Sequence, residues 1–311
     1  MKKLLYIYNP HSGRGQVRVV LSQIIDIFAN KGYEVTTCAT TGKDFAKDKV
    51  REEAGAYDLV VCSGGDGTLD EVVTGMMQRE NRVPIGYIPT GSTNDFAHTL
   101  KIPRNNMLKA AEIAVGGKPY PCDVGAFNDD YFVYVAAFGL FSDVSYQTPQ
   151  NMKHVFGHVA YILEGAKRLQ DIPSYHMLVR TDDRQIQDDF VYGMISNSDY
   201  VGGLKNTMDR GISLNDGVFE VSLIRRPTNP IMWQEVVAAL MMPRLLPSDH
   251  IYTFKTSHIE IFSTKEVPWS LDGEFGGDHD HVVIDNRFRE ITFMVGEDVI
   301  ESMNSPMPDI F

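Results

Sequence analysis

Residues 63–72 read SGGDGTLDEV and directly follow an apolar run, YDLVVC, at residues 57–62. Two adjacent glycines allow a backbone to approach a bulky anion closely, because no Cβ stands in the way. A helix that begins near Leu69 would point its first amides, and the positive end of its dipole, at that anion. The stretch therefore predicts a phosphate-binding turn between a buried strand and a helix. A plain tight turn, which also favours Gly and Asp, is the alternative.

Asp66 lies in the middle of this turn, where a carboxylate would meet phosphates. Two anions tolerate such closeness only with a cation between them, and Mg²⁺ is the simplest choice. The stretch thus predicts a site for a nucleotide and Mg²⁺.

Strands and helices alternate on both sides of the turn, which predicts a parallel sheet. Two further turns are rich in Gly and hydroxyl residues, residues 9–15 and 89–96. Ligands bind at the carboxyl ends of parallel strands, so the three turns are expected on one rim. The turn at 9–15 lacks the spacing and lysine of a P-loop, and by itself suits structure and phosphate binding equally. The expected strands are 4–8, 33–39, 57–62 and 84–88, and the expected helices are 17–30, 43–55, 69–79 and 107–116.

The pattern changes near residue 120, where strands begin to dominate. We expect an α/β N-terminal domain, residues 1–124 with a returning segment 291–311, and an antiparallel β domain, residues 125–290. The second domain is expected to contain a hairpin (120–126 and 131–137), a helix (154–170) and strands at 175–181, 187–196, 217–224, 252–263, 281–285 and 290–295.

The composition of the chain limits the classes of partner that it is expected to bind. The 311 residues carry a formal net charge of −12, which argues against nucleic acid as the main partner. The three cysteines are widely spaced, as in a reducing cytosol. No stretch is apolar enough to span a bilayer, so any membrane contact is expected to be peripheral. Residues 241–247 are expected to form a packed loop or, alternatively, an apolar lip on a bilayer.

Two carboxylates, Asp272 and Glu274, flank Gly273 far downstream. A hairpin turn explains this pattern when it is taken alone. A kinase that acts on an alcohol, however, needs a carboxylate base near the hydroxyl, and either residue suits that role. The triplet Asn215-Asp216-Gly217 is typical of a turn, and its Asp could also hold a divalent cation.

The motifs taken in order resemble the soluble bacterial diacylglycerol kinase and related lipid-kinase family. They are Asn9-Pro10 with Ser12-Gly13, Gly64 to Leu69 with Glu71, Gly91 with Asn94-Asp95-Phe96-Ala97, Asn215-Asp216-Gly217, and Leu271 to Glu274. The resemblance implies an N-terminal α/β nucleotide domain and a C-terminal β-sandwich domain, a fold of the NAD kinase and diacylglycerol kinase type.

The resemblance also implies site residues. Glu274 or Asp272 would deprotonate the lipid hydroxyl, with Asp66 as a further catalytic residue, and Ser213, Asp216 and the carbonyl of Val218 match a structural Mg²⁺ site. The implied ATP contacts are Asn9, Pro10, His11, Ser12, Gly13, Thr40, Gly64, Gly65, Asp66, Gly67, Thr68, Leu69, Asp70 and Thr93.

The leading hypothesis is an ATP- and Mg²⁺-dependent kinase for the free hydroxyl of diacylglycerol or a related lipid. We expect a cytoplasmic protein that meets its lipid at the inner membrane face, and possible homodimers. Other acceptors (a sphingoid base, another glycolipid or NAD) and a non-catalytic lipid-binding protein with the same fold are the alternatives.

Overall fold

The computed structural model describes residues 1–139, 173–198, 200–201, 204–205, 213–241, 248–297 and 299–300. The chain forms two compact units. The first comprises Met1–Val124, Ser213–Asp216 and the chain from Arg287 onward, and the second comprises the rest. The short segment Ser213–Asp216 thus returns to the first unit, whereas the sequence placed it in the second domain.

The first unit contains a parallel sheet, as the alternating pattern predicted. Its strands run in the order β2-β1-β3-β4, and β4 also pairs in parallel with β15 where Phe293 faces Ile85. Every residue of β3 is buried, which explains why its first four residues, 59–62, are all apolar. The bounds are β1 Lys2–Tyr8, β2 Tyr33–Ala39, β3 Leu59–Gly64, β4 Ile85–Pro89 and β15 Glu274–Val295.

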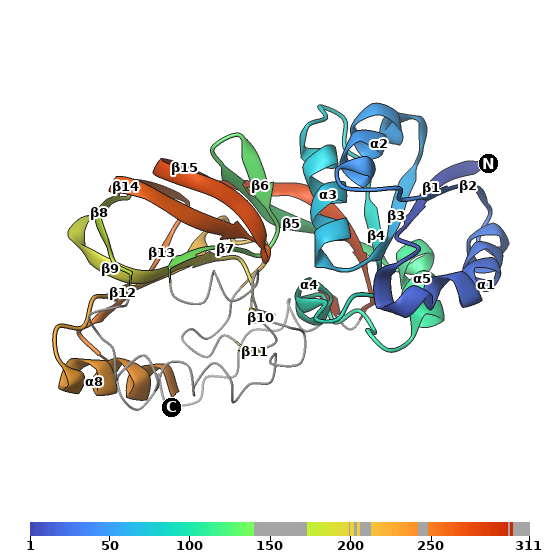
Figure 1. The fold of residues 1–311 in the computed structure, drawn as a ribbon. Helices are drawn as coiled ribbons and strands as arrows, with labels where there is room; N and C mark the ends of the chain where they lie inside the picture. Colours follow the sequence, from blue (N-terminus) through green and yellow to red (C-terminus); the bar gives the residue numbers. More distant parts are fainter. Residues whose placement is uncertain are drawn as a thin grey trace. The chain divides into compact units, whose positions relative to one another are not determined.

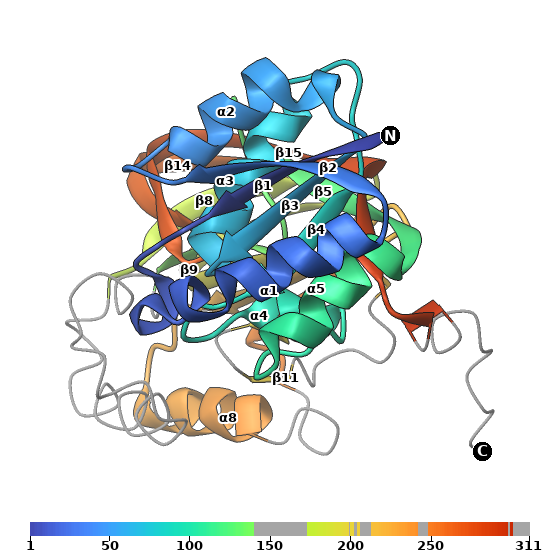
Figure 2. The ribbon, with the colours of Figure 1, turned by 90° about the vertical axis from the view of Figure 1, so that its right-hand side faces the viewer.

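Helices cover both faces of this sheet (Figure 2), with α2 and α3 on one face and α1 and α5 on the other. Helix α1 buries Val17, Ile24 and Phe28, the apolar stripe that predicted it. Helix α3 begins at Asp66 and not near Leu69 as expected, which places Asp66 in its first turn. The bounds are α1 Val17–Asn30, α2 Phe45–Glu53, α3 Asp66–Met77, α4 Asp95–Thr99 and α5 Met107–Gly116.

The second unit is built from antiparallel strands, as predicted, but they do not form two separate sheets. Strand β9 pairs with β8 along its first part and with β7 along its second part, and the long strand β14 does the same. The pairing therefore closes a circuit β9-β7-β14-β8 that joins the two layers visible in Figure 1. The bounds are β5 Lys118–Phe127, β6 Asp130–Phe132, β7 Val135–Gly139, β8 Tyr175–Arg180, β9 Gln185–Ser196, β10 Tyr200–Val201, β11 Leu204–Lys205, β12 Phe219–Arg225, β13 Ile251–Thr256 and β14 His258–Leu271.

Aromatic side chains fill the core of the second unit. Trp269 packs edge-on against Phe127 and Phe138, with ring centroids 5.1 and 4.8 Å apart. Such edge-to-face pairs add about 0.5–1.5 kcal/mol each to the burial of their area. Trp269 belongs to the part of β14 that leads into Asp272, so a packed core supports that turn.

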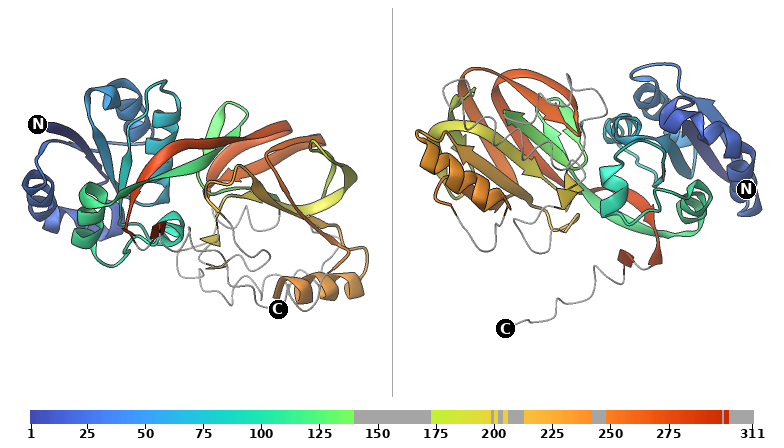
Figure 3. Two further views of the ribbon diagram at one scale, coloured as in Figure 1. Left: turned by 180° about the vertical axis from the view of Figure 1, so that it is seen from behind. Right: turned by 60° about the horizontal axis from the view of Figure 1, so that its bottom comes forward.

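Other elements depart from expectation. The predicted strand 252–263 is broken at Ser257 into β13 and β14, whereas 281–285 and 290–295 are parts of the single strand β15. Helix α8 (Pro230–Met241), visible in Figure 3, was not predicted. Its Trp233 joins a small core cluster with Ile224 of β12. The predicted helix 154–170 and residues 242–247 lie outside the described residues. None of the described helices is both long enough and apolar enough to cross a membrane.

Candidate active site

Three turns meet at the carboxyl ends of β1, β3 and β4, as the parallel topology predicted. The amide of Asn9 donates to the carbonyl of Ser63 at 2.8 Å, and its side chain donates to the Thr68 hydroxyl at 3.5 Å. Gly13 has a φ of +56°, and a Cβ there would overlap the carbonyl oxygen of Thr90. The turn after β1 is therefore packed directly against the turns after β3 and β4.

The other two turns touch through their glycines. A Cβ on Gly91 would lie 2.5 Å from the Cα of Gly65, so only glycine permits this approach. Asn94 closes the turn of Gly91, accepting from its amide at 2.8 Å and donating to its carbonyl at 2.9 Å. The buried Tyr87 hydroxyl lies 3.3 Å from the Gly64 carbonyl, to which it donates. These contacts build one glycine-lined rim at the N-terminus of α3.

Gly91→Ala is expected to weaken nucleotide binding strongly. The new Cβ would meet backbone at Gly65, which cannot move aside as a flexible side chain can. Overpacking of this kind costs about 1–3 kcal/mol, which corresponds to a rise of roughly 5- to 150-fold in the Kd for ATP, measured by calorimetry.

Gly116→Ala is the matched control. Its Cβ would make only ordinary contacts, at 3.5 and 3.6 Å, with the end of the Lys31 side chain. ATP affinity should not change in this variant. Wild-type affinity in Gly91→Ala would contradict the role of the glycine contact.

Asp66 is a carboxylate in an unfavourable setting at this rim. Burial, and then the neighbouring carboxylate of Asp95, raise the pKa of Asp66, while hydrogen bonds from the Thr93 hydroxyl and from the backbone of Asp95 and Asn94 lower it. That hydroxyl donates to Oδ2 at 3.2 Å, whereas Oδ1 is buried with no hydrogen-bond partner among the described residues. A cation at Oδ1 would relieve both the desolvation and the repulsion from Asp95.

The remaining predicted nucleotide contacts occupy different positions. Thr40 follows β2 and donates its amide to Tyr8 at 2.9 Å, so it lies at the same edge of the sheet. His11 donates its amide to the side chain of Asn9 at 2.9 Å. The side chain of Leu69 is buried and its amide donates to Gly65, so Leu69 supports the helix rather than facing the rim. The other predicted contacts Pro10, Ser12, Gly67 and Asp70 lie within the same turns or the first turns of α3.

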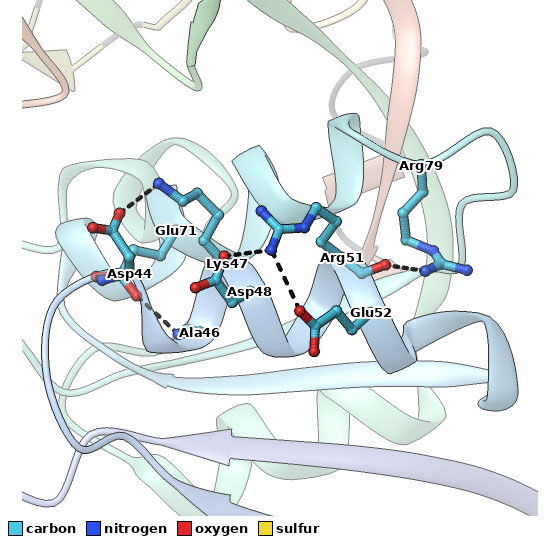
Figure 4. Close-up of polar contacts among 8 residues, drawn as sticks. All are labelled: Asp44, Ala46, Lys47, Asp48, Arg51, Glu52, Glu71 and Arg79. Carbon is cyan, nitrogen blue, oxygen red and sulfur yellow. Dashed lines mark hydrogen bonds and ion pairs between the residues drawn. The ribbon is translucent and has the colours of Figure 1, made fainter.

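Glu71 of α3 has a structural role that sequence reasoning missed. Its carboxylate accepts from the amides of Asp44 and Ala46 at 2.9 and 3.0 Å, which caps the N-terminus of α2 (Figure 4). At the other end of α2, Arg79, just beyond α3, donates to the carbonyl of Arg51. The negative charge of Glu71 thus lies at the positive N-terminal end of the α2 dipole, and the positive charge of Arg79 lies at its negative C-terminal end. The partners lie 25–28 residues apart in sequence, so no local pattern could have revealed them.

Asp272 and Glu274, both in the second unit, have contrasting surroundings. Asp272 is 3% exposed, and its carboxylate accepts hydrogen bonds from the amides of Val133, Tyr134 and Val135. Glu274 is exposed at the start of β15. Of the two carboxylates that the sequence offered as a base, Asp272 is buried and Glu274 is exposed.

The predicted structural metal ligands are divided between the units. Ser213 and Asp216 belong to the first unit and Val218 to the second. The Ser213 hydroxyl donates to the side chain of Asn215 at 3.0 Å. The described residues include no group of three or more His, Cys, Asp or Glu side chains that could hold a metal ion.

Comparison with known proteins agrees with this architecture. The family model of the diacylglycerol kinase catalytic domain matches residues 3–127. A diacylglycerol kinase of Bacillus subtilis (strain 168) is 33% identical over 278 residues, which cover 89% of this chain and 91% of the relative. A diacylglycerol kinase of Staphylococcus epidermidis is 29% identical over 277 residues, with 89% and 87% covered. A solved structure of a candidate diacylglycerol kinase from Bacillus anthracis str. Sterne matches with a TM-score of 0.80, 25% identity and 96% of both chains covered.

Backbone amides of glycine turns at a helix N-terminus form an arrangement that suits an anion such as phosphate. The chain belongs to the diacylglycerol kinase family, and it is a lipid kinase.

Proposed function

We propose that the protein transfers the γ-phosphoryl group of ATP, with Mg²⁺, to the free hydroxyl of diacylglycerol, giving phosphatidic acid. The observation that carries the proposal is Asp66, a carboxylate kept at a glycine-lined helix N-terminus despite burial and a neighbouring Asp95. Burial and Asp95 disfavour the ionised form of this carboxylate, and a cation with phosphates at the rim would offset that effect.

The residues of the rim suit Mg²⁺. This ion is usually held by one or two carboxylates together with substrate phosphates and water. Asp66 offers an oxygen, Oδ1, with no hydrogen-bond partner among the described residues, and a second carboxylate, Asp95, lies near enough to raise its pKa. When bound, Mg²⁺ neutralises charge on the phosphates. We also propose Mg²⁺ at Ser213, Asp216 and Val218, which rests on the family resemblance.

Backbone amides and side chains have different roles in the transfer. Amides of the glycine turns and of the first turn of α3 hold the phosphates. Glu274 accepts the proton of the lipid hydroxyl as the hydroxyl oxygen attacks the γ-phosphorus in line, and ADP leaves with the electrons of the broken P–O bond. Asp272 takes no part in the proton transfer because three amides already occupy its carboxylate. Peripheral contact with the inner membrane face would present the lipid, and a homodimer is part of the same proposal.

Radiolabelled ATP with a panel of lipids in mixed micelles tests the function. The panel contains diacylglycerol, a sphingoid base and monoacylglycerol, with NAD as a soluble acceptor, each with Mg²⁺ and with EDTA. The expected result is labelled phosphatidic acid from diacylglycerol in the Mg²⁺ arm alone. Label on another acceptor would identify that acceptor as the substrate in place of diacylglycerol. Lipid binding without any labelled product would favour the non-catalytic alternative.

A further inference from the structure

Asp272 is held like a bound anion inside the second unit. Its Oδ2 accepts from the amide of Val133 at 2.6 Å, and its Oδ1 accepts from the amides of Tyr134 and Val135 at 3.0 and 2.9 Å. The side chain is 3% exposed. Hydrogen bonds to an ionised acceptor are about twice as strong as those between neutral groups. The three bonds therefore fix the carboxylate against residues 133–135.

The backbone of Asp272 is tied to the same segment. Its amide donates to the carbonyl of Val135 at 2.8 Å, and its carbonyl accepts from the Tyr134 hydroxyl at 3.0 Å. Asp272 thus joins two segments that lie 137–139 residues apart in sequence. A residue held through its side chain, its amide and its carbonyl cannot rotate independently of the segment that it binds.

This anchor sets the turn that carries Glu274. Asp272 and Gly273 both have left-handed backbone, with φ of +51° and +86°, and Leu271 pairs with Glu274 across the turn. Asp-Gly is a preferred pair for such a two-residue turn, so the local sequence specifies the shape of the turn. The bonds of the Asp272 carboxylate to three amides specify how the turn is attached to residues 133–135. The orientation of Glu274 relative to that segment therefore depends on the Asp272 carboxylate.

We propose that Asp272 is a positioning residue, which holds the Glu274 carboxylate in its reactive orientation and transfers no proton itself. The inference rests on the proposed function, in which Glu274 is the base. It explains why two carboxylates flank one glycine: the first binds backbone and the second reacts.

Asp272→Asn tests the proposal. An amide group presents an N–H donor where the carboxylate accepts, so at least one of the three bonds is lost. The expected result is a fall in kcat of about 10- to 100-fold, since a small misplacement of a reacting group can cost about 100-fold. The KM for ATP should not change, and kcat should keep the pH profile of the wild type because Glu274 is intact. Loss of the acid limb of that profile would overturn the proposal.

Two further variants distinguish a misplaced Glu274 carboxylate from a general loss of folding. Gly273→Ala adds a Cβ that meets nothing within 4 Å, so it disturbs only the backbone of the turn, whose φ is +86°. It should lower kcat and leave the KM for ATP unchanged, even if Asp272→Asn fails to fold. Wild-type kcat in Gly273→Ala would overturn the proposal. Asp278→Asn, an exposed position of β15, is the matched control and should not change kcat.

The amide signals of residues 133–135 provide a readout that needs no lipid. In Asp272→Asn these three amides should shift in the NMR spectrum, while in Asp278→Asn they should not. If the wild type phosphorylates no lipid, the proposed function fails even though the shifts still report the anchor. If the wild type is active and Asp272→Asn keeps full kcat, the positioning role fails alone.

Discussion

Asp66→Asn is expected to reduce turnover strongly and to stabilise the fold at neutral pH. The variant would lack the negative charge that faces a cation and phosphates, so kcat at saturating ATP should fall by about 100-fold or more. The side-chain oxygen of the new amide could still accept from the Thr93 hydroxyl, which contacts Asp66 in the wild type. The buried charge beside Asp95 would be gone, and the thermal unfolding midpoint should rise.

The pH dependence of that stabilisation follows from the raised pKa of Asp66. Its ordinary value is 3.8, and burial and then Asp95 raise it in the folded state. The folded protein therefore holds this proton more tightly than the unfolded chain does, so the stability contributed by Asp66 falls as pH rises between the two values. Below the unfolded value both states are protonated, and the difference between Asp66→Asn and wild type should be smallest there.

The measurement is thermal unfolding from pH 4 to pH 8 in EDTA, beside a kinase assay at saturating ATP. Asp26→Asn, an exposed position on α1, is the control and should change neither quantity. Wild-type kcat in Asp66→Asn would reject the proposed mechanism. An unfolding midpoint of Asp66→Asn below that of the wild type at pH 8 would show that the carboxylate stabilises the empty rim.

Glu274→Gln should lower kcat by about 10²- to 10⁴-fold, the usual contribution of a general base. Glutamine has the same shape but cannot accept the hydroxyl proton. Because Glu274 is exposed and makes no part of the glycine rim, the KM for ATP should not change. The acid limb of the kcat–pH profile should disappear, which distinguishes loss of a base from a general loss of structure.

Glu266→Gln is the matched control for this substitution. Glu266 is an exposed residue of β14, and its replacement should leave kcat unchanged. Steady-state kinetics with diacylglycerol micelles and varied ATP measure both quantities. If Glu274→Gln retained more than about a tenth of wild-type kcat, the base would have to be another group.

Much of the first unit could be predicted because its elements carry local signals. Helix α1 and strand β2 have the expected bounds, since each has an apolar period or a terminating glycine. Parallel topology alone brought the turns of Asn9, Gly65 and Gly91 together, because it places the carboxyl ends of strands on one edge.

The features that escaped prediction all depend on partners remote in sequence. The amide cradle of Asp272 comes from residues 133–135, and the circuit of the second unit depends on two long strands that change partners along their length. Helix α8 is apolar on more than one face, and a helical period is weak in such a segment. A local sequence pattern predicts neither long-range hydrogen bonds nor changes of strand partner.

The double attachment of α2 has a consequence for local unfolding. Because Glu71 holds the first turn of α2 and Arg79 holds its last, α2 cannot open without breaking charged contacts to α3 or its C-terminal extension. The close packing of Gly75 on the backbone of Lys47 adds to this coupling. The two helices therefore form one cooperative unit, whose amides should share a common free energy of opening in native-state hydrogen exchange. Phosphate captured at the start of α3 would slow exchange throughout α2, a helix whose own sequence is polar.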